Sequence, residues 1–306
     1  PLAPPRTLPG DELLDAKAAG FSLGMGRSRS FPFPQYRAKD PYRTVFFDVG
    51  EGPKTVVMIH GLGANATHFE PVAREMARNH RVIGIDLVGC GWSNKPDVPY
   101  SVNLLRDHLL DFLDRRGVGR CNLVGHSMGG AVCLSAALKR PGQFDSLALI
   151  CAAGVAPLPA WMRTSARYAL RRQLLLPLLV MGHTFIIKNI FVTTARNNEN
   201  VAWFKRSFAR DALHMPNFRQ WVRVCETLCK DLALHDYADQ LQHLHMPVLA
   251  LWGDHDKLTA VPSVMRSLDN IRQIRTVMLK DCGHMPMIEY PEQTTWHLER
   301  FLSTPP

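Results

Sequence analysis

Residues 120–139 read RCNLVGHSMGGAVCLSAALK. The pattern predicts a strand at Arg120–Val124 and a helix at Met128–Lys139, joined by a G-x-S-x-G sequence at residues 125–129. The glycines let the chain turn sharply and hold Ser127 in a strained conformation, with its hydroxyl at the carboxyl end of the strand. We therefore predict that Ser127 is a nucleophile. The alternative is a glycine-rich helix start at which this serine only caps the helix.

Strands and helices alternate on both sides of this turn. The predicted strands are Thr44–Val49, Thr55–Ile59, Arg81–Asp86, Asp145–Cys151, Pro247–Trp252 and Ile274–Lys280, and the predicted helices are Phe69–Asn79, Val102–Arg116, Val261–Leu268 and Pro291–Leu302. Strand–helix units repeated at short intervals are typical of a parallel sheet with helices on both faces. We therefore predict an α/β fold with a mostly parallel central sheet.

The alternation is interrupted between Gly154 and Pro247, and this interruption divides the chain into parts. Residues 1–41, rich in Pro, Gly, Ser and Arg, are predicted to form an N-terminal arm. Residues 42–154 and 246–306 form the predicted core, and residues 155–245 a helical cap (lid) inserted into it. Hydrophobic residues make up 46% and charged residues 21% of the 306, with no apolar run of 18. This composition excludes a disordered chain and argues against a membrane-spanning helix.

A serine hydroxyl needs a base to take its proton and a carboxylate to orient that base. His284 lies just after the last predicted strand, in the loop sequence DCGHMP. Two carboxylates, Asp254 and Asp256, follow the preceding strand in the sequence GDHDK. The chain order serine, acid, histidine is the order found with this type of nucleophile turn. The residues alone leave both acids open as the partner of His284.

Five segments in this order resemble the α/β-hydrolase superfamily, over residues 42–303. They are HGLG at 60–63, DLVGCGWS at 86–93, GHSMGG at 125–130, WGDHD at 252–256 and GH at 283–284. In the family pattern W-G-x-x-D the acid is the last residue, so the resemblance favours Asp256 over Asp254. It implies a catalytic triad of Ser127, Asp256 and His284.

The resemblance also implies an oxyanion hole beside the serine. Acyl transfer places negative charge on a carbonyl oxygen, which two preorganised backbone N–H groups should meet. One N–H group belongs to Met128, the residue after the nucleophile, and the other is assigned to Leu62. His60 and Gly61, just before it, are candidate substrate contacts, and their alternative role is to close and buttress the loop.

Two more residues of the matching segments are candidates for a role near the site. Trp92 is a candidate substrate contact, with a core or surface aromatic as the alternative. Asp86, at the end of its strand, could be mistaken for a catalytic carboxylate. In proteins that this chain resembles it orders the turn at residues 89–93, and we expect that structural role here.

The predicted activity is that of a serine hydrolase that cleaves carboxylic esters through an acyl-enzyme intermediate, with no metal or cofactor implied. The apolar runs of the cap at residues 174–181 and 185–187 favour an apolar acyl group of medium or greater length. A carbon–carbon bond hydrolase acting on a vinylogous diketone is an alternative, although that group often has Asn where this chain has His126. Thioesters, lactones and amides stay open as substrates, as does a non-enzymatic small-molecule receptor on the same fold.

The net charge of +9 is concentrated in the cap region. Residues 155–247 contain twelve Lys and Arg against six Asp and Glu, which places +6 there. A nucleic-acid partner is not expected, because no binding motif accompanies the charge. The basic cap could instead lie against a lipid surface or face only solvent.

Seven cysteines without paired spacing indicate a reduced protein. Cys225 and Cys229 share a helical face, but His235 alone is poor support for a zinc site there. We therefore predict a cytoplasmic protein, with a removed leader left open. Nothing in the sequence indicates an oligomeric state.

Overall fold

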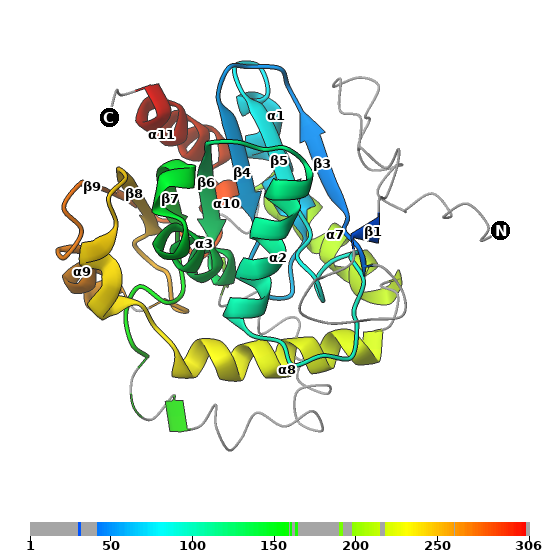
Figure 1. The fold of residues 1–306 in the computed structure, drawn as a ribbon. Coiled ribbons are helices and arrows are strands. Elements are labelled where there is room, and N and C mark those ends of the chain that lie inside the picture. Colours follow the sequence, from blue (N-terminus) through cyan, green and yellow to red (C-terminus); the bar gives the residue numbers. More distant parts are fainter. Residues whose placement is uncertain are drawn as a thin grey trace.

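A seven-stranded sheet forms the centre of the computed structural model (Figure 1). The structure describes residues 30–31, 42–158, 160, 163–164, 190–191, 198–214, 218–259 and 261–303. The strands of this sheet are β3 (Phe46–Val49), β4 (Thr55–Ile59), β5 (Arg81–Ile85), β6 (Cys121–His126), β7 (Phe144–Ile150), β8 (Val248–Gly253) and β9 (Ile274–Leu279). Their order is β3-β5-β4-β6-β7-β8-β9. β3 is antiparallel to β5, and every other neighbouring pair is parallel. The predicted α/β fold with a mostly parallel sheet is confirmed.

The central strands are buried on both faces, as parallel strands covered by helices must be. Every residue of β6 and of β8 is buried. Successive side chains of a strand point to opposite faces of the sheet. In β4, Val57 and Ile59 therefore join one apolar cluster, and Val56 and Met58 join the other. Each face of the sheet has its own hydrophobic core.

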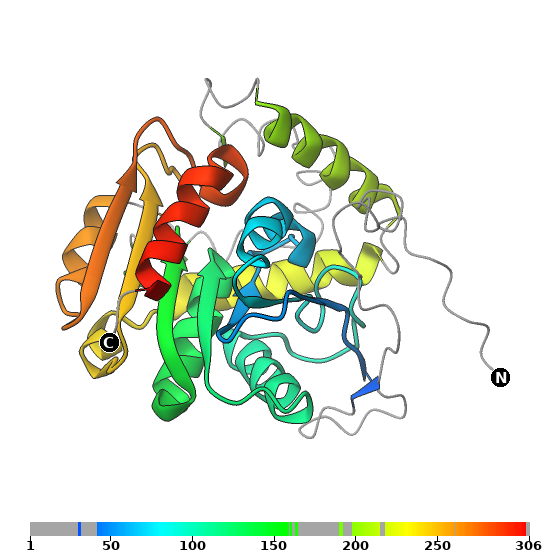
Figure 2. The same ribbon diagram turned by 90° about the horizontal axis from the view of Figure 1, so that it is seen from above.

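Helices from distant parts of the chain cover the two faces. One face carries α2 (Val102–Arg115), α3 (Met128–Lys139) and α9 (Val261–Leu268), and the other carries α1 (Glu70–Met76), α10 (Pro286–Glu289) and α11 (Pro291–Ser303). Figure 2 shows the red α11 on one side of the sheet and the green α3 on the other. The loops that follow the carboxyl ends of the parallel strands lie along one edge of the sheet, between the two helix layers. Ligands of α/β folds bind at that edge.

Two further helices are described within the part of the chain predicted as the cap. They are α7 (Glu199–His214) and α8 (Phe218–Leu234), and a short 3₁₀ helix, η4 (Ala238–His243), follows them. The backbone N–H of Val102, which begins α2, donates to the Asp231 carboxylate of α8 at 2.7 Å. This bond attaches α8 to the core. No described helix combines the length and the apolar composition needed to cross a membrane.

Most element bounds agree with the sequence predictions within two residues. Three short helices were not predicted: η1 (Ala66–Phe69), η2 (Pro141–Gln143) and α10. Each has only three or four residues, too few to display a helical period.

Part of the predicted arm pairs with the start of the core. β1 (Ser30–Phe31) and β2 (Tyr42–Arg43) form a separate antiparallel sheet of two strands. The rest of the predicted arm, and the apolar runs of the cap at 174–181 and 185–187, lie outside the described residues. The three predicted parts of the chain stay a prediction.

Candidate active site

Ser127 lies in a sharp turn between β6 and α3. Its backbone has φ 52° and ψ −120°, a conformation that residues other than glycine rarely adopt. The turn is packed too closely for side chains, since a Cβ on Gly129 would overlap the carbonyl oxygen of Ile59. The predicted strained turn is therefore present, and it puts Ser127 at the carboxyl edge of the sheet and at the positive end of the α3 dipole.

A buried hydrogen bond joins His284 to Asp256. The distance from His284 Nδ1 to Asp256 Oδ2 is 2.9 Å, and both residues are more than nine-tenths buried. An ionised carboxylate only accepts hydrogen bonds, so Nδ1 carries a proton, and in the neutral ring the lone pair is on Nε2. His284 thus has the tautomer that a base toward a serine requires.

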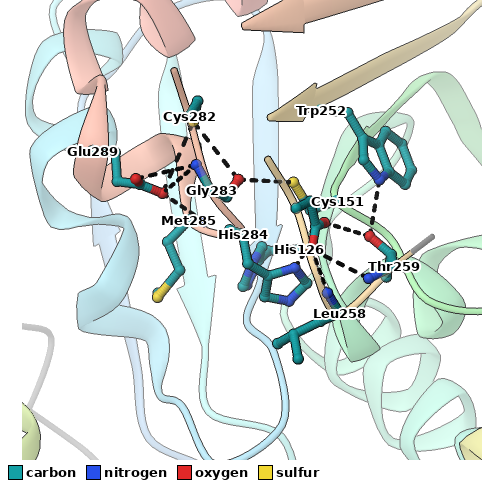
Figure 3. Close-up of polar contacts among 11 residues, drawn as sticks. His126, Cys151, Trp252, Leu258, Thr259, Cys282, Gly283, His284, Met285 and Glu289 are labelled. Atoms are coloured by element: carbon teal, nitrogen blue, oxygen red, sulfur yellow. Dashed lines mark hydrogen bonds and ion pairs between the residues drawn. The ribbon is translucent and has the colours of Figure 1, made fainter. Parts of the chain in front are cut away.

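His126 connects the serine turn to the His284 loop. Its Nε2 donates to the carbonyl oxygen of His284 at 2.9 Å, and the two ring centroids are 4.9 Å apart (Figure 3). Burial, together with the nearby His284, lowers the pKa of His126 well below its usual range, so this ring is neutral. Because His126 directly precedes Ser127, these contacts bring the candidate nucleophile and the candidate base to one place.

The Asp256 carboxylate is held on both of its oxygens. Oδ1 accepts from the backbone N–H groups of Leu258 at 2.8 Å and Thr259 at 3.2 Å. Oδ2 accepts from the Thr259 hydroxyl and from His284. Burial opposes ionisation, but attraction to His284 and these hydrogen bonds outweigh it and lower the pKa of Asp256 to about 2. The acid is therefore an anion at neutral pH.

Asp254, the competing carboxylate, faces a different partner. Its side chain pairs with the half-exposed His255 at 2.7 Å and accepts from the backbone N–H of Cys282 at 3.2 Å. Among the described residues, the carboxylate that bonds His284 is that of Asp256. The geometry thus agrees with the acid that the family pattern favours.

The loop expected to supply an oxyanion donor passes beside Ser127. A Cβ on Gly61 would lie 3.1 Å from Ser127 Cβ and 2.9 Å from His126 Nδ1. Gly61 therefore lets the backbone approach Ser127 closely. Met128 directly follows Ser127 at the start of α3, and Leu62 directly follows Gly61. The oxyanion hole formed by their two amides stays a prediction.

His60 supports this loop from behind. It is fully buried, its Nδ1 donates to the Gly61 carbonyl at 2.7 Å, and its Nε2 accepts from the Leu87 N–H at 3.3 Å. Burial lowers the pKa of His60 despite the charge of Asp86. Both ring nitrogens are thus used by backbone groups, which matches the buttressing alternative for this residue.

Asp86 and Trp92 belong to the neighbouring turn. The buried Asp86 carboxylate accepts from the backbone N–H groups of Ala66 at 2.7 Å and Trp92 at 2.8 Å. These contacts are those of the structural role expected for Asp86. The Trp92 side chain is half-buried in this turn, and its substrate contact stays a prediction.

A cavity of about 140 Å³ opens beside Ser127. Its walls come from the segment after β7, from α8, from the loop that carries Asp256 and from α9. The lining residues are Ser127, Ala152, Ala153, Gly154, Ala156, Pro157, Leu158, Leu232, Leu258, Thr259, Ser263 and Val264. Most of these side chains are apolar, so the cavity suits an uncharged group next to the serine.

The family model of the alpha/beta hydrolase fold matches residues 54–291. The chain belongs to the alpha/beta hydrolase family. This match covers β4 to β9 of the sheet, the serine turn, α7, α8 and the His284 loop. The protein is a hydrolase of alpha/beta fold, as the motif resemblance implied.

Proteins similar to this hydrolase act on more than one kind of bond. Lipase 1 of Psychrobacter immobilis is 27% identical over 252 residues, covering 81% of this chain and 76% of the lipase. A 2-hydroxy-6-oxo-6-(2'-aminophenyl)hexa-2,4-dienoic acid hydrolase of Metapseudomonas resinovorans is 27% identical over 268 residues, covering 85% and 87%. The crystal structure of a membrane phospholipase A, a bacterial virulence factor, is 26% identical with a TM-score of 0.77, covering 96% and 89%.

Glu289 is a residue of this hydrolase that the sequence patterns did not single out. Only 1% of it is exposed, and its carboxylate accepts from the N–H groups of Gly283, at 3.0 and 3.1 Å, and Met285, at 3.2 Å (Figure 3). These are the two chain neighbours of His284, so Glu289 fixes the loop that carries the imidazole. An acid directly after the apolar Pro286–Ile288 was the available signal, because a buried carboxylate needs such partners.

All seven cysteines of this hydrolase are free. Among the described residues, one group of potential metal ligands lies close together: Cys151, Asp256 and His284, with ligand atoms within 4.8 Å of one another. Two of the three already bond to each other, and burial raises the pKa of the Cys151 thiol well above its usual range. A protonated thiol is a poor metal ligand, so Cys151, Asp256 and His284 fit a hydrogen-bonded cluster better than a metal centre.

Proposed function

We propose that this hydrolase cleaves carboxylic esters with an apolar, medium-to-long acyl group by way of an acyl-enzyme. The observation that carries the proposal is the buried 2.9 Å bond from His284 to Asp256. This bond orients the His284 imidazole. The same ring contacts His126, which directly precedes Ser127 in the strained turn. This geometry supports Ser127 as the nucleophile, His284 as the base and Asp256 as the orienting acid of a serine hydrolase.

In the proposed mechanism, Ser127 Oγ attacks the ester carbonyl while His284 Nε2 takes its proton. The N–H groups of Leu62 and Met128 receive the developing oxyanion. The imidazolium, stabilised by the Asp256 carboxylate, then gives its proton to the departing alcohol. Water, deprotonated by the same imidazole, attacks the acyl-enzyme and releases the acid and the free serine.

The acyl preference is supported by the cavity walls and by the similar proteins. Leu232 of the cap and Leu258 beside the acid both line the cavity at Ser127. Each methylene of the acyl chain that these side chains remove from water contributes about 0.8 kcal/mol. The similarity to a lipase and to a membrane phospholipase A makes glycerides and phospholipids suitable substrates for testing.

A panel of p-nitrophenyl esters from acetate to palmitate tests the proposal. We expect kcat/KM to rise by about 10-fold or more from the acetate to the octanoate ester, as methylenes enter the cavity. Ser127→Ala should lower kcat by about 10⁴-fold or more and abolish labelling by a serine-reactive phosphonate. If no ester is hydrolysed, or if the alanine variant remains active, the proposal is wrong.

A carbon–carbon bond hydrolase is the second candidate, because the Metapseudomonas resinovorans relative is named for a hexadienoic acid. His126 argues against it, since Asn often precedes the serine in that group. A vinylogous 1,5-diketone assayed beside the ester panel distinguishes the two. Turnover of the diketone alone would replace the ester assignment.

A further inference from the structure

A chain of buried hydrogen bonds reaches the Asp256 carboxylate from the side opposite His284. Trp252 Nε1 donates to Thr259 Oγ1 at 2.9 Å, and Thr259 Oγ1 donates to Asp256 Oδ2 (Figure 3). Trp252 is fully buried and Thr259 is 9% exposed. Trp252 is the penultimate residue of β8, so this chain of hydrogen bonds is anchored in the sheet.

The direction of each bond in this chain is fixed by its end groups. The indole N–H of Trp252 can only donate, and the Asp256 carboxylate can only accept. The Thr259 hydroxyl must therefore accept from the indole and turn its proton toward Oδ2. That same oxygen accepts from His284, while Oδ1 is held by the backbone.

We propose that Thr259 is a positioning residue of the hydrolase: its hydroxyl, aimed by Trp252, holds Asp256 Oδ2 in line with the His284 ring. The proposal rests on the proposed function, because it assigns His284 the part of the base. Two donors on one oxygen prevent the carboxylate from rotating. The two hydrogen bonds also divide the negative charge of Oδ2 between two donors. The Thr259 hydroxyl therefore limits how strongly Asp256 stabilises a protonated imidazole.

Other titratable groups that face the Asp256–His284 pair come from four places. His126 approaches from β6, Cys151 from the end of β7, and Cys282 and Glu289 from the His284 loop and α10. None of the hydrogen bonds that these groups make to described residues involves the Thr259 hydroxyl. A change at Thr259 therefore alters the carboxylate while these groups keep their bonds.

The direct test replaces Thr259 by Val, which keeps the shape and the backbone N–H but removes the hydroxyl. With the best ester of the panel, we expect Thr259→Val to lower kcat by about 10-fold and change KM by less than about 2-fold. The acid side of the kcat/KM profile should move up by about 0.5 pH unit, because more carboxylate charge then stabilises the protonated imidazole. Thr259→Ser restores the hydroxyl and should recover most of kcat.

Two further variants separate this role from general packing. Trp252→Phe leaves the hydroxyl in place but removes the donor that aims it, so we expect a smaller change in the same direction. Thr294→Val is the matched control, because Thr294 is fully buried in α11 and its hydroxyl has no partner among the described residues. This control should leave kcat and the pH profile unchanged.

The proposal is overturned if Thr259→Val keeps the wild-type kcat and pH profile. It is also overturned if Thr259→Val and Thr259→Ser lose activity and Tm equally, since that result assigns only a packing role. If the wild type hydrolyses no ester, the proposed function fails, and the low-field proton resonance of His284 Nδ1 then tests the positioning role alone. That resonance should shift in Thr259→Val and return in Thr259→Ser, and an unchanged resonance rejects the proposal.

Discussion

Two neighbouring pairs of buried aspartate and histidine lie at the carboxyl edge of the sheet, and they use their hydrogen bonds differently. Asp86 and His60 spend both carboxylate oxygens and both ring nitrogens on backbone groups. Asp256 and His284 bond to each other, and His284 Nε2 has no partner among the described residues. Burial and residue type are therefore shared by the two pairs. The second pair differs in its direct Asp–His hydrogen bond, which leaves His284 Nε2 available for the proposed role of base.

Removing the negative charge of Asp256 should have the largest effect on kcat. We expect Asp256→Asn to lower kcat by about 10³- to 10⁴-fold, because an amide both donates and accepts and so permits the wrong imidazole tautomer. Asp254→Asn is the control and should change kcat by less than about 3-fold, since Asp254 pairs with His255. Ester kinetics at pH 7.5 measure both, and a larger loss from Asp254→Asn would reverse the assignment.

The backbone clamp at Glu289 should matter less than the acid itself. Glu289→Gln keeps the shape but replaces one acceptor oxygen by an N–H₂ group that faces N–H donors. We expect kcat to fall by about 10-fold, because the loop then holds His284 less firmly. Glu292→Gln, on the exposed face of α11, is the matched control. Equal kinetics for the two variants would mean that the clamp does not position His284.

The first pair should respond in stability rather than in rate. Asp86→Asn places an N–H₂ group against the N–H of Ala66 or Trp92, so we expect the free energy of unfolding to fall by about 2 kcal/mol. The kcat of the folded variant should stay within about 3-fold of wild type. Urea unfolding measures the first quantity, with the exposed Asp269→Asn as control. A loss of kcat as large as that of Asp256→Asn would erase the distinction between the pairs.

The smallest expected effect is that of His60 on the pH dependence of the free energy of unfolding. Burial lowers the pKa of His60 below 6.5, so below that pH the unfolded chain binds more protons than the folded protein. The free energy of unfolding should therefore fall as pH drops below about 6.5, by at most about 1.4 kcal/mol per pH unit for this one group. Urea titrations at pH 7.5 and 5.5 measure the slope. It should be shallower in His60→Asn, and an identical slope would contradict the prediction.

The main features of the fold and site follow from short-range patterns. The serine turn could be predicted because strand, glycines and helix are contiguous in residues 120–139. His284 could be located from its place after a strand. The choice of Asp256 over Asp254 needed the family pattern, because the two acids are two residues apart and only the loop geometry separates them.

The supporting contacts could not be predicted, because they depend on how separate segments pack. Thr259 reaches Asp256 only because residues 254–259 curl back on themselves and Trp252 turns toward them. Glu289 lies in a helix of four residues, which has no periodic signature. In both cases the sequence shows an ordinary polar residue, and only the fold shows that it is buried beside the site.

The left-handed backbone of Ser127 lowers the stability of the fold at the residue proposed to carry the activity. A φ of 52° costs a serine on the order of 1–3 kcal/mol, a penalty that glycine largely avoids. A Ser127→Gly protein, inactive under the proposed mechanism, should therefore have a higher Tm than the wild type. Selection for heat resistance without selection for turnover would then favour loss of the proposed nucleophile.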